Sequence, residues 1–107
     1  MGNSVNIVDL KDCVLKRKIK WTAHVAQRIQ ERDISRHDVM NCILTGEIIE
    51  NYPQDYPHPS CLVFGLTVNS ETLHVVVGFD FEFLYIITAY YPNILKFEAD
   101  LKTRKES

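Results

Sequence analysis

Cysteine and glycine are scarce in this chain of 107 residues, and both scarcities exclude classes of protein. The three cysteines, Cys13, Cys42 and Cys61, are odd in number and widely spaced. They fit neither a disulfide framework nor a Cys-x-x-Cys metal or redox pair, so we expect reduced, half-buried thiols. The four glycines form no phosphate-binding loop, and the acidic residues form no convincing metal cluster. We therefore expect no metal and no cofactor.

Long apolar runs are missing as well. No segment approaches the roughly 18 apolar residues of a membrane span, and the first residues, MGNSVNIVDL, lack the basic-then-apolar order of a signal peptide. Asn6 stands where a myristoylation signal needs Ser or Thr. What is present is ordinary for a globular protein, with 46% apolar and 24% charged residues. We expect one cytoplasmic domain, residues 1–107, without a membrane partner.

The net charge of −2 conceals an uneven distribution. Residues 11–36 contain eight Lys or Arg and three acids, whereas residues 37–107 contain four Lys or Arg and ten acids. A local basic excess of this kind can attract phosphate whatever the global balance, although a solvated helix face explains a charge run equally well.

The spacing of apolar residues predicts helices in the first half of the chain and strands in the second. Helices are expected at about 6–18, at 22–32 with Thr22 as N-cap, and at 35–46 with Ser35 as N-cap. Four strands are expected in EIIENY, SCLVFGLTV, TLHVVVGF and FLYIITAYY, separated by a Pro-rich loop and two short turns. The tail KFEADLKTRKES is read as a short helix or a frayed end. The predicted fold is α+β, with N-terminal helices packed on a twisted four-stranded antiparallel sheet.

Three polar side chains follow one edge of the second predicted helix. His24, Arg28 and Arg32 are four residues apart, so the two arginines lie about 40° and 80° around the helix from the histidine. They border the apolar stripe of that helix, which suits a site at the seam between helix and sheet. The alternative is that Arg28 and Arg32 pair with surface acids such as Glu31 or Asp33.

A second polar group lies in the last two predicted strands. Thr88 and Tyr90 are two residues apart and share one face, opposite Ile87 and Ala89. If the hairpin pairs residues whose numbers give an even sum of 162–164, His74 lies opposite Thr88 or Tyr90. The alternative is a polar cross-strand cluster without chemistry.

The two groups together suit RNA cleavage without a metal. That reaction needs a base near neutral pKa for the 2′-hydroxyl proton, cations for the charge on phosphorus, and an acid for the leaving 5′ oxygen. Histidine and arginine can supply all three. The residues leave open which of His24 and His74 is the acid and which is the base.

The order of these segments also resembles a known family. The stretch WTAHVAQRIQERDISRHDVMNCILTGEIIENYP, followed by LHVVV and IITAYYP, resembles small bacterial domains of unknown function. That family is grouped with RelE/ParE-like and BrnT-like toxins in the barnase, EndoU, colicin and RelE ribonuclease assemblage, and the resemblance covers about residues 21–104. It implies a RelE-like fold, a toxin-like endoribonuclease and a cognate antitoxin protein as partner. It places the recurrent polar positions at His24, Arg28, Arg32, His74, Thr88 and Tyr90.

Two functions of different classes follow from these observations. The first is a toxin-like endoribonuclease in which a histidine transfers the proton, Arg28 and Arg32 hold the phosphate, and Tyr90 and Thr88 orient it. The second is a non-catalytic module that keeps the toxin fold and binds a partner protein or nucleic acid. A structural domain with incidental histidines is the third possibility. The sequence does not name the RNA or the oligomeric state.

Overall fold

Three helices and five strands make up the protein, whose structure is a computed structural model that describes residues 4–105. The helices are α1 (Ile7–Leu15), α2 (Ala23–Glu31) and α3 (Arg36–Thr45). The strands are β1 (Ile19–Trp21), β2 (Glu47–Tyr52), β3 (Ser60–Leu66), β4 (Thr72–Phe79) and β5 (Leu84–Tyr90). None of the helices in this part of the chain is long and apolar enough to cross a membrane.

The helices begin where the predicted caps place them. The side chain of Thr22 accepts the N–H of Val25 at 3.1 Å, and Ser35 forms a reciprocal capping box with Asp38. The first helix is shorter than the predicted 6–18, because Arg17 adopts a left-handed backbone with φ of 57° just beyond its last turn. The chain then turns directly into β1.

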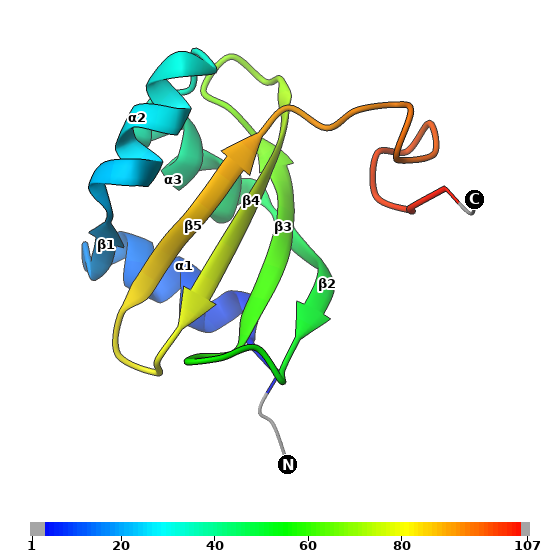
Figure 1. Ribbon diagram of the computed structural model, residues 1–107. Coiled ribbons are helices and arrows are strands. Elements are labelled where there is room, and N and C mark those ends of the chain that lie inside the picture. The colour runs from blue at the N-terminus through cyan, green and yellow to red at the C-terminus, as the bar shows by residue number, and fades with distance from the viewer. Residues whose placement is uncertain (1–3, 106–107) are drawn as a thin grey trace.

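The predicted four-stranded antiparallel sheet is wrong. The sheet has five strands in the order β1-β5-β4-β3-β2, and β1 pairs with β5 in parallel while the other neighbours are antiparallel. The missed strand has only three residues between two helices, too few to display the two-residue alternation that identifies a strand. It extends the sheet beyond β5, on the side where α2 lies (Figure 1).

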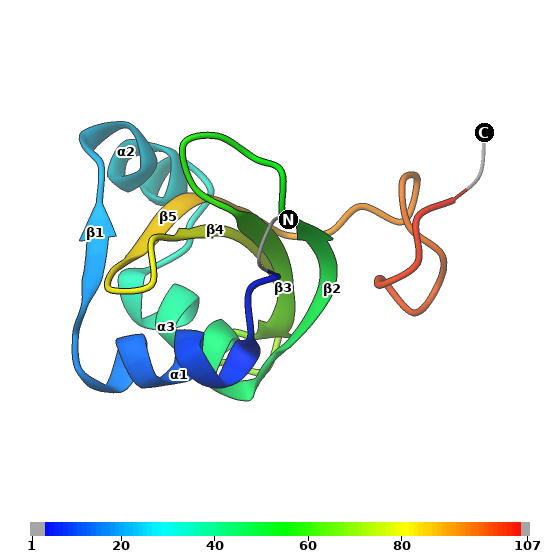
Figure 2. The same cartoon turned by 90° about the horizontal axis from the view of Figure 1, so that it is seen from below.

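Helices α1 and α3 cover one face of the sheet (Figure 2), and the core lies between them. Leu73, Val75 and Val77 of β4 are fully buried there. All three cysteines are free and buried, more deeply than predicted, and burial raises the pKa of Cys42 and of Cys61 to about 12. These thiols are protonated packing groups at neutral pH.

The sheet face turned away from α1 and α3, here called the outer face, carries the predicted polar residues. His74 pairs with Tyr90 and Val76 pairs with Thr88, so of the two partners predicted for His74, Thr88 or Tyr90, the structure has Tyr90. The register then shifts by one residue at Ile87, which is a β-bulge.

The bulge changes which residues of β5 reach the outer face. The core-facing residues are Leu84, Ile86 and Ala89, all of them buried. Ile87 is 49% exposed, so the prediction that it shares the core face with Ala89 is wrong. Because the extra residue resets the alternation, Tyr85 and Ile87 before the shift and Thr88 and Tyr90 after it all lie on the outer face.

As far as residue 105, the segment after β5 forms neither the helix nor the frayed end predicted for the tail, whose last two residues lie outside the described part of the chain. Residues 91–105 turn back over the outer face toward β2 (Figures 1 and 2) and close on themselves through an isolated bridge between Phe97 and Arg104. Lys102 pairs with Glu47 of β2 at 3.3 Å. Phe97 is 2% exposed, so this segment supplies one large apolar group that covers the sheet.

Candidate functional site

A cleft of about 440 Å³ lies on the outer face, where the end of α2, the end of β5 and the C-terminal segment meet. Its lining residues are Arg32, Thr88, Tyr90, Asn93, Lys96, Phe97 and Arg104. Three of these are cations, and no acidic residue lines the cleft within residues 4–105. The cleft is therefore suited to an anion.

Arg32 is fixed at the wall of this cleft by the end of β5. Its Nη1 donates to Thr88 Oγ1 at 3.1 Å and to the carbonyl oxygen of Ala89 at 2.9 Å. Within the described residues it forms no ion pair with a carboxylate, so the alternative of pairing with Glu31 or Asp33 does not apply to it. A guanidinium has five N–H groups, and the fork that remains can bind phosphate oxygens.

His74 lies directly behind Tyr90 and is fully buried. Its Nε2 is 2.7 Å from the carbonyl oxygen of Leu101, and its Nδ1 is 3.4 Å from the Tyr90 hydroxyl. A carbonyl oxygen only accepts, so we assign the proton to Nε2. Nδ1 then presents a lone pair to the Tyr90 hydroxyl, which donates to it.

Burial fixes the protonation states of this pair. It lowers the pKa of His74, with the Leu101 carbonyl acting in the opposite direction, and it raises the pKa of Tyr90. At neutral pH the imidazole is therefore uncharged and the phenol is protonated. Phe97 packs edge-on against the imidazole with ring centroids 4.7 Å apart, which keeps water from it.

Glu50 on β2 holds Arg104, the third cation of the cleft, in position. It accepts from Nε of Arg104 at 2.7 Å and from the Tyr52 hydroxyl. Burial alone would raise the pKa of Glu50, but the hydrogen bonds from Tyr52 and Arg104 lower it on balance. Arg104 is thereby held 4.9 Å above the Phe97 ring at the border of the cleft.

The buried imidazole should make stability depend on pH. The pKa of His74 is lower in the folded chain than in the unfolded chain, where it is about 6.5. Below about pH 6.5 the unfolded state therefore binds more protons than the folded state. The free energy of unfolding should decrease as the pH falls from about 6.5 to the pKa of His74 in the folded chain. Urea unfolding between pH 7 and pH 5.5 should show this loss, with a limiting slope of about 1.4 kcal/mol per pH unit. His74→Gln, which can still donate to Leu101, should flatten the slope; an unchanged slope would contradict the assignment.

The remaining predicted site residues lie elsewhere on α2. His24 and Arg28 are exposed, do not line the cleft and, within residues 4–105, have no hydrogen bond or ion pair to His74 or Tyr90. The structure thus brings Arg32, Thr88 and Tyr90 together with His74 behind them, and leaves His24 and Arg28 outside.

The cations of the basic stretch, residues 11–36, do not gather at the cleft. Lys16 pairs with Asp12 at 3.1 Å, and the Arg36 guanidinium lies 5.0 Å above the Trp21 ring. Only Arg32 of this stretch reaches the cleft, and the other two cations come from the acidic half of the chain.

Sequence reasoning missed the contribution of the C-terminal segment. The cleft is lined by Asn93, Lys96, Phe97 and Arg104, whereas the sequence predicted only a short helix or a frayed end from Lys96 onward. No distinct signal for this is present in the sequence, because Phe97 follows Ile94 and Leu95 closely, and those two side chains are exposed while Phe97 is buried.

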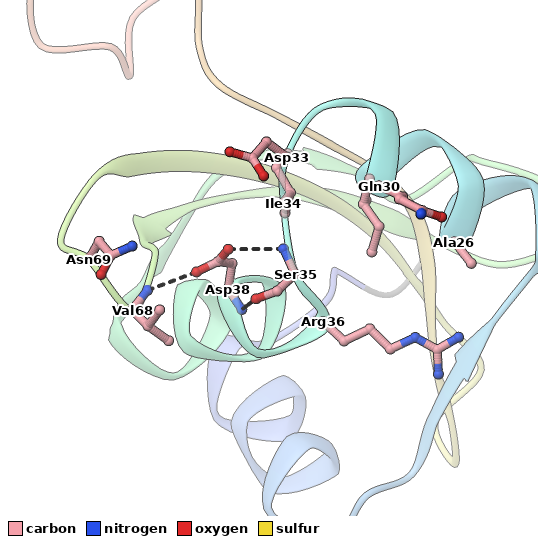
Figure 3. Close-up of a pocket in the computed structure, with 10 residues that line it drawn as sticks. Ala26, Gln30, Asp33, Ile34, Ser35, Arg36, Asp38, Val68 and Asn69 are labelled. Carbon is pink, nitrogen blue, oxygen red and sulfur yellow. Dashed lines mark hydrogen bonds between the residues drawn. The ribbon is translucent and has the colours of Figure 1, made fainter.

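A larger cavity, of about 610 Å³, lies between α2, α3 and the loop after β3 (Figure 3). Two acids, Asp33 and Asp38, line it, and Asp38 accepts the N–H groups of Ser35 at 2.9 Å and Val68 at 3.1 Å, so Asp38 serves as a cap and a loop anchor. Burial alone would raise the pKa of Asp38, but these backbone hydrogen bonds lower it on balance. Nowhere in residues 4–105 do three His, Cys, Asp or Glu side chains gather closely enough to hold a metal ion.

Comparison with known proteins identifies a family. No curated protein and no solved structure matches the chain. A family model described as Domain of unknown function (DUF4258) matches residues 21–91, which run from the last residue of β1 to just past β5 and leave residues 92–105 outside the match. The chain belongs to this DUF4258 family.

Proposed function

We propose that the protein is a metal-independent endoribonuclease of the toxin-antitoxin type, and that it cleaves RNA in the cleft beside Tyr90. The observation that carries this proposal is the orientation of a neutral His74, whose Nδ1 faces the Tyr90 hydroxyl in a cleft lined by cations and no acid. The sequence resemblance to RelE/ParE-like and BrnT-like toxins supports the same reaction. A cognate antitoxin is the protein partner that this function implies.

The charges suit the transition state of phosphodiester cleavage. Attack of the 2′ oxygen on phosphorus spreads additional negative charge over the phosphoryl oxygens. Arg32, Lys96 and Arg104 surround the space in which those oxygens would lie. Because Arg32 is already held by Thr88 and Ala89, it does not need to reorganise when this charge develops.

The proton can move through Tyr90 to His74. As the bond from the 2′ oxygen to phosphorus forms, the 2′-hydroxyl proton passes to the Tyr90 oxygen and the proton of Tyr90 passes to His74 Nδ1. The bond from phosphorus to the 5′ oxygen breaks, and water protonates that oxygen. The hydroxide left behind takes the proton back from His74 through Tyr90. The products are a 2′,3′-cyclic phosphate and a 5′-hydroxyl, and Tyr90 is the catalytic residue while His74 positions and accepts its proton.

The burial of His74 favours a second candidate. The C-terminal segment covers the imidazole completely, so no substrate atom touches it in this conformation. A non-catalytic module would use the same cationic cleft to hold a phosphate of RNA without breaking a bond. In that case the pairing of His74 with Leu101 would serve only to fasten the segment to the sheet.

Purified protein in a metal-chelated buffer separates the two functions. The nuclease should convert a labelled RNA into fragments ending in 2′,3′-cyclic phosphate, tested both with and without ribosomes. Expression of the chain alone should arrest growth in parallel. Binding of RNA without fragments under both conditions would remove the enzyme proposal and leave the binding module.

A further inference from the structure

A second cavity, of about 260 Å³, lies on the same outer face as the cleft, at the opposite end of β5. It is lined by Asp55, Tyr56, Pro57, His58, Ser60, Gly78, Tyr85 and Ile87. Ser60, Gly78 and Tyr85 are neighbours across three strands, with Gly78 in the middle. The bulge at Ile87 is what places this cavity and the cleft on one face, because it aligns Tyr85 and Ile87 with Thr88 and Tyr90.

The floor of the cavity is flat because its central residue has no side chain. A Cβ added at Gly78 would meet only ordinary contacts, the nearest being Ile87 Cδ1 at 3.6 Å. On one side Tyr85 stacks with His58, with ring centroids 5.3 Å apart and planes 14° apart. The Tyr85 hydroxyl donates to Asp80 at 2.6 Å, which fixes the ring. Such a floor and wall fit a planar ring.

The loop over this floor contributes an aromatic side chain and one acceptor. Tyr56 is 95% exposed, so its ring is available to cover a ligand. Asp55 accepts a hydrogen bond from the buried Ser60 hydroxyl through Oδ2. Its Oδ1 has no hydrogen-bond partner within the described residues and is the acceptor that the cavity offers.

We infer that this cavity binds a nucleobase with an exocyclic amino group, supplied by the RNA whose phosphate occupies the cleft. This inference rests on the proposed function. Bases stack on aromatic side chains through their faces, and an amino group donates to a carboxylate. Uracil has one carbonyl oxygen where cytosine has its amino group, and Asp55 repels this oxygen, so that the ring N3–H is the only donor of uracil that faces the same edge. A phosphate is repelled likewise, so the backbone is directed toward the cationic cleft.

The distance between the two cavities suits one strand of RNA. Tyr85 at the base cavity pairs with Gly78 and Thr88 at the cleft pairs with Val76, so the bulge leaves them two strand positions apart, about 7 Å along the sheet. A base and a phosphate of the same short segment can therefore occupy both cavities at once. Asp55 would then select the base, while Arg32 and its neighbours hold the phosphate.

Cytidine and uridine are the matched probes, because they differ only at position 4 of the base, amino against carbonyl, and in the proton on N3, and because they carry no phosphate. Titration of the full chain by NMR should show cytidine shifting the amide signals of Gly78 and Tyr85 with at least about 10-fold higher affinity than uridine. Asp55→Asn should abolish this preference, Tyr56→Ala should weaken both nucleosides, and Asp9→Asn, which removes an exposed carboxylate on α1, should change neither.

Equal binding of the two nucleosides to the wild type, or a cytidine preference that survives Asp55→Asn, would overturn the inference. The outcome is independent of catalysis, since no bond is broken. Cytidine binding at Gly78 in a protein that leaves RNA intact would support the base site while removing the nuclease proposal. Cleavage of RNA by a protein that shows no preference for cytidine would support the nuclease proposal and remove the base site.

Discussion

Tyr90→Phe should slow RNA cleavage by about 100- to 10,000-fold, the scale of a lost acid-base group. The substitution removes the hydroxyl that lies between the cleft and Nδ1 of His74 and keeps the ring that packs against the imidazole. The hydrogen bond that is lost is long, so the free energy of unfolding should change by no more than about 1 kcal/mol. Single-turnover cleavage measured beside urea unfolding separates the two effects.

His74→Gln is the companion to this variant. Glutamine can donate to the Leu101 carbonyl as Nε2 does, but it has no basic nitrogen to receive the proton of Tyr90. The rate should fall on a similar scale, and the decline of activity at low pH that reflects protonation of His74 should disappear. A Tyr90→Phe protein that cleaves at the wild-type rate would exclude the relay, whatever the result at His74.

Much of the fold followed from local patterns, because the deciding interactions are local. Thr22 and Ser35 cap their helices through atoms three residues away, and the alternation of β4 alone places His74 opposite its core residues. Because the turn after β4 is short, the sequence could also limit the partner of His74 to Thr88 or Tyr90 for an even register, and the structure has Tyr90.

The parts that could not be predicted depend on contacts between distant segments. β1 is three residues long, and its partners on β5 lie more than 60 residues away in the sequence. No local alternation of apolar and polar residues therefore identifies it as a strand. The bulge at Ile87 requires the register of two strands, and a strict alternation places that residue on the wrong face. The missed parallel strand is why the predicted four-stranded antiparallel sheet was wrong although the three helices were found.

The candidate site shows the same division. His24, Arg28 and Arg32 share one helix edge in the sequence. Arg32 alone reaches the cleft, because the end of α2 lies beside β5. The C-terminal segment contributes four lining residues through ion pairs with β2, including Arg104 with Glu50 at 2.7 Å, and those partners are 54 residues apart. Helix periodicity contains no information on either contact.

Arg32→Ala should reduce cleavage by about 100-fold or more, because it removes a preorganised donor to charge that develops in the transition state. The effect should fall mainly on the rate and only weakly on RNA binding, as expected for an interaction made in the transition state. Loss of the bonds to Thr88 and the Ala89 carbonyl should also cost roughly 1 kcal/mol of stability, which urea unfolding measures separately.

Arg28→Ala is the matched control, because Arg28 is exposed one turn earlier on the same helix and does not line the cleft. If the cleft is the phosphate site, this variant should cleave at close to the wild-type rate while Arg32→Ala does not. Arg32→Lys should recover only part of the activity, since one ammonium cannot hold Thr88, the Ala89 carbonyl and a phosphate oxygen in the fixed fork of a guanidinium. A large loss of cleavage activity in Arg28→Ala, with none in Arg32→Ala, would place the phosphate site on the exposed edge of α2, beside His24, and not in the cleft.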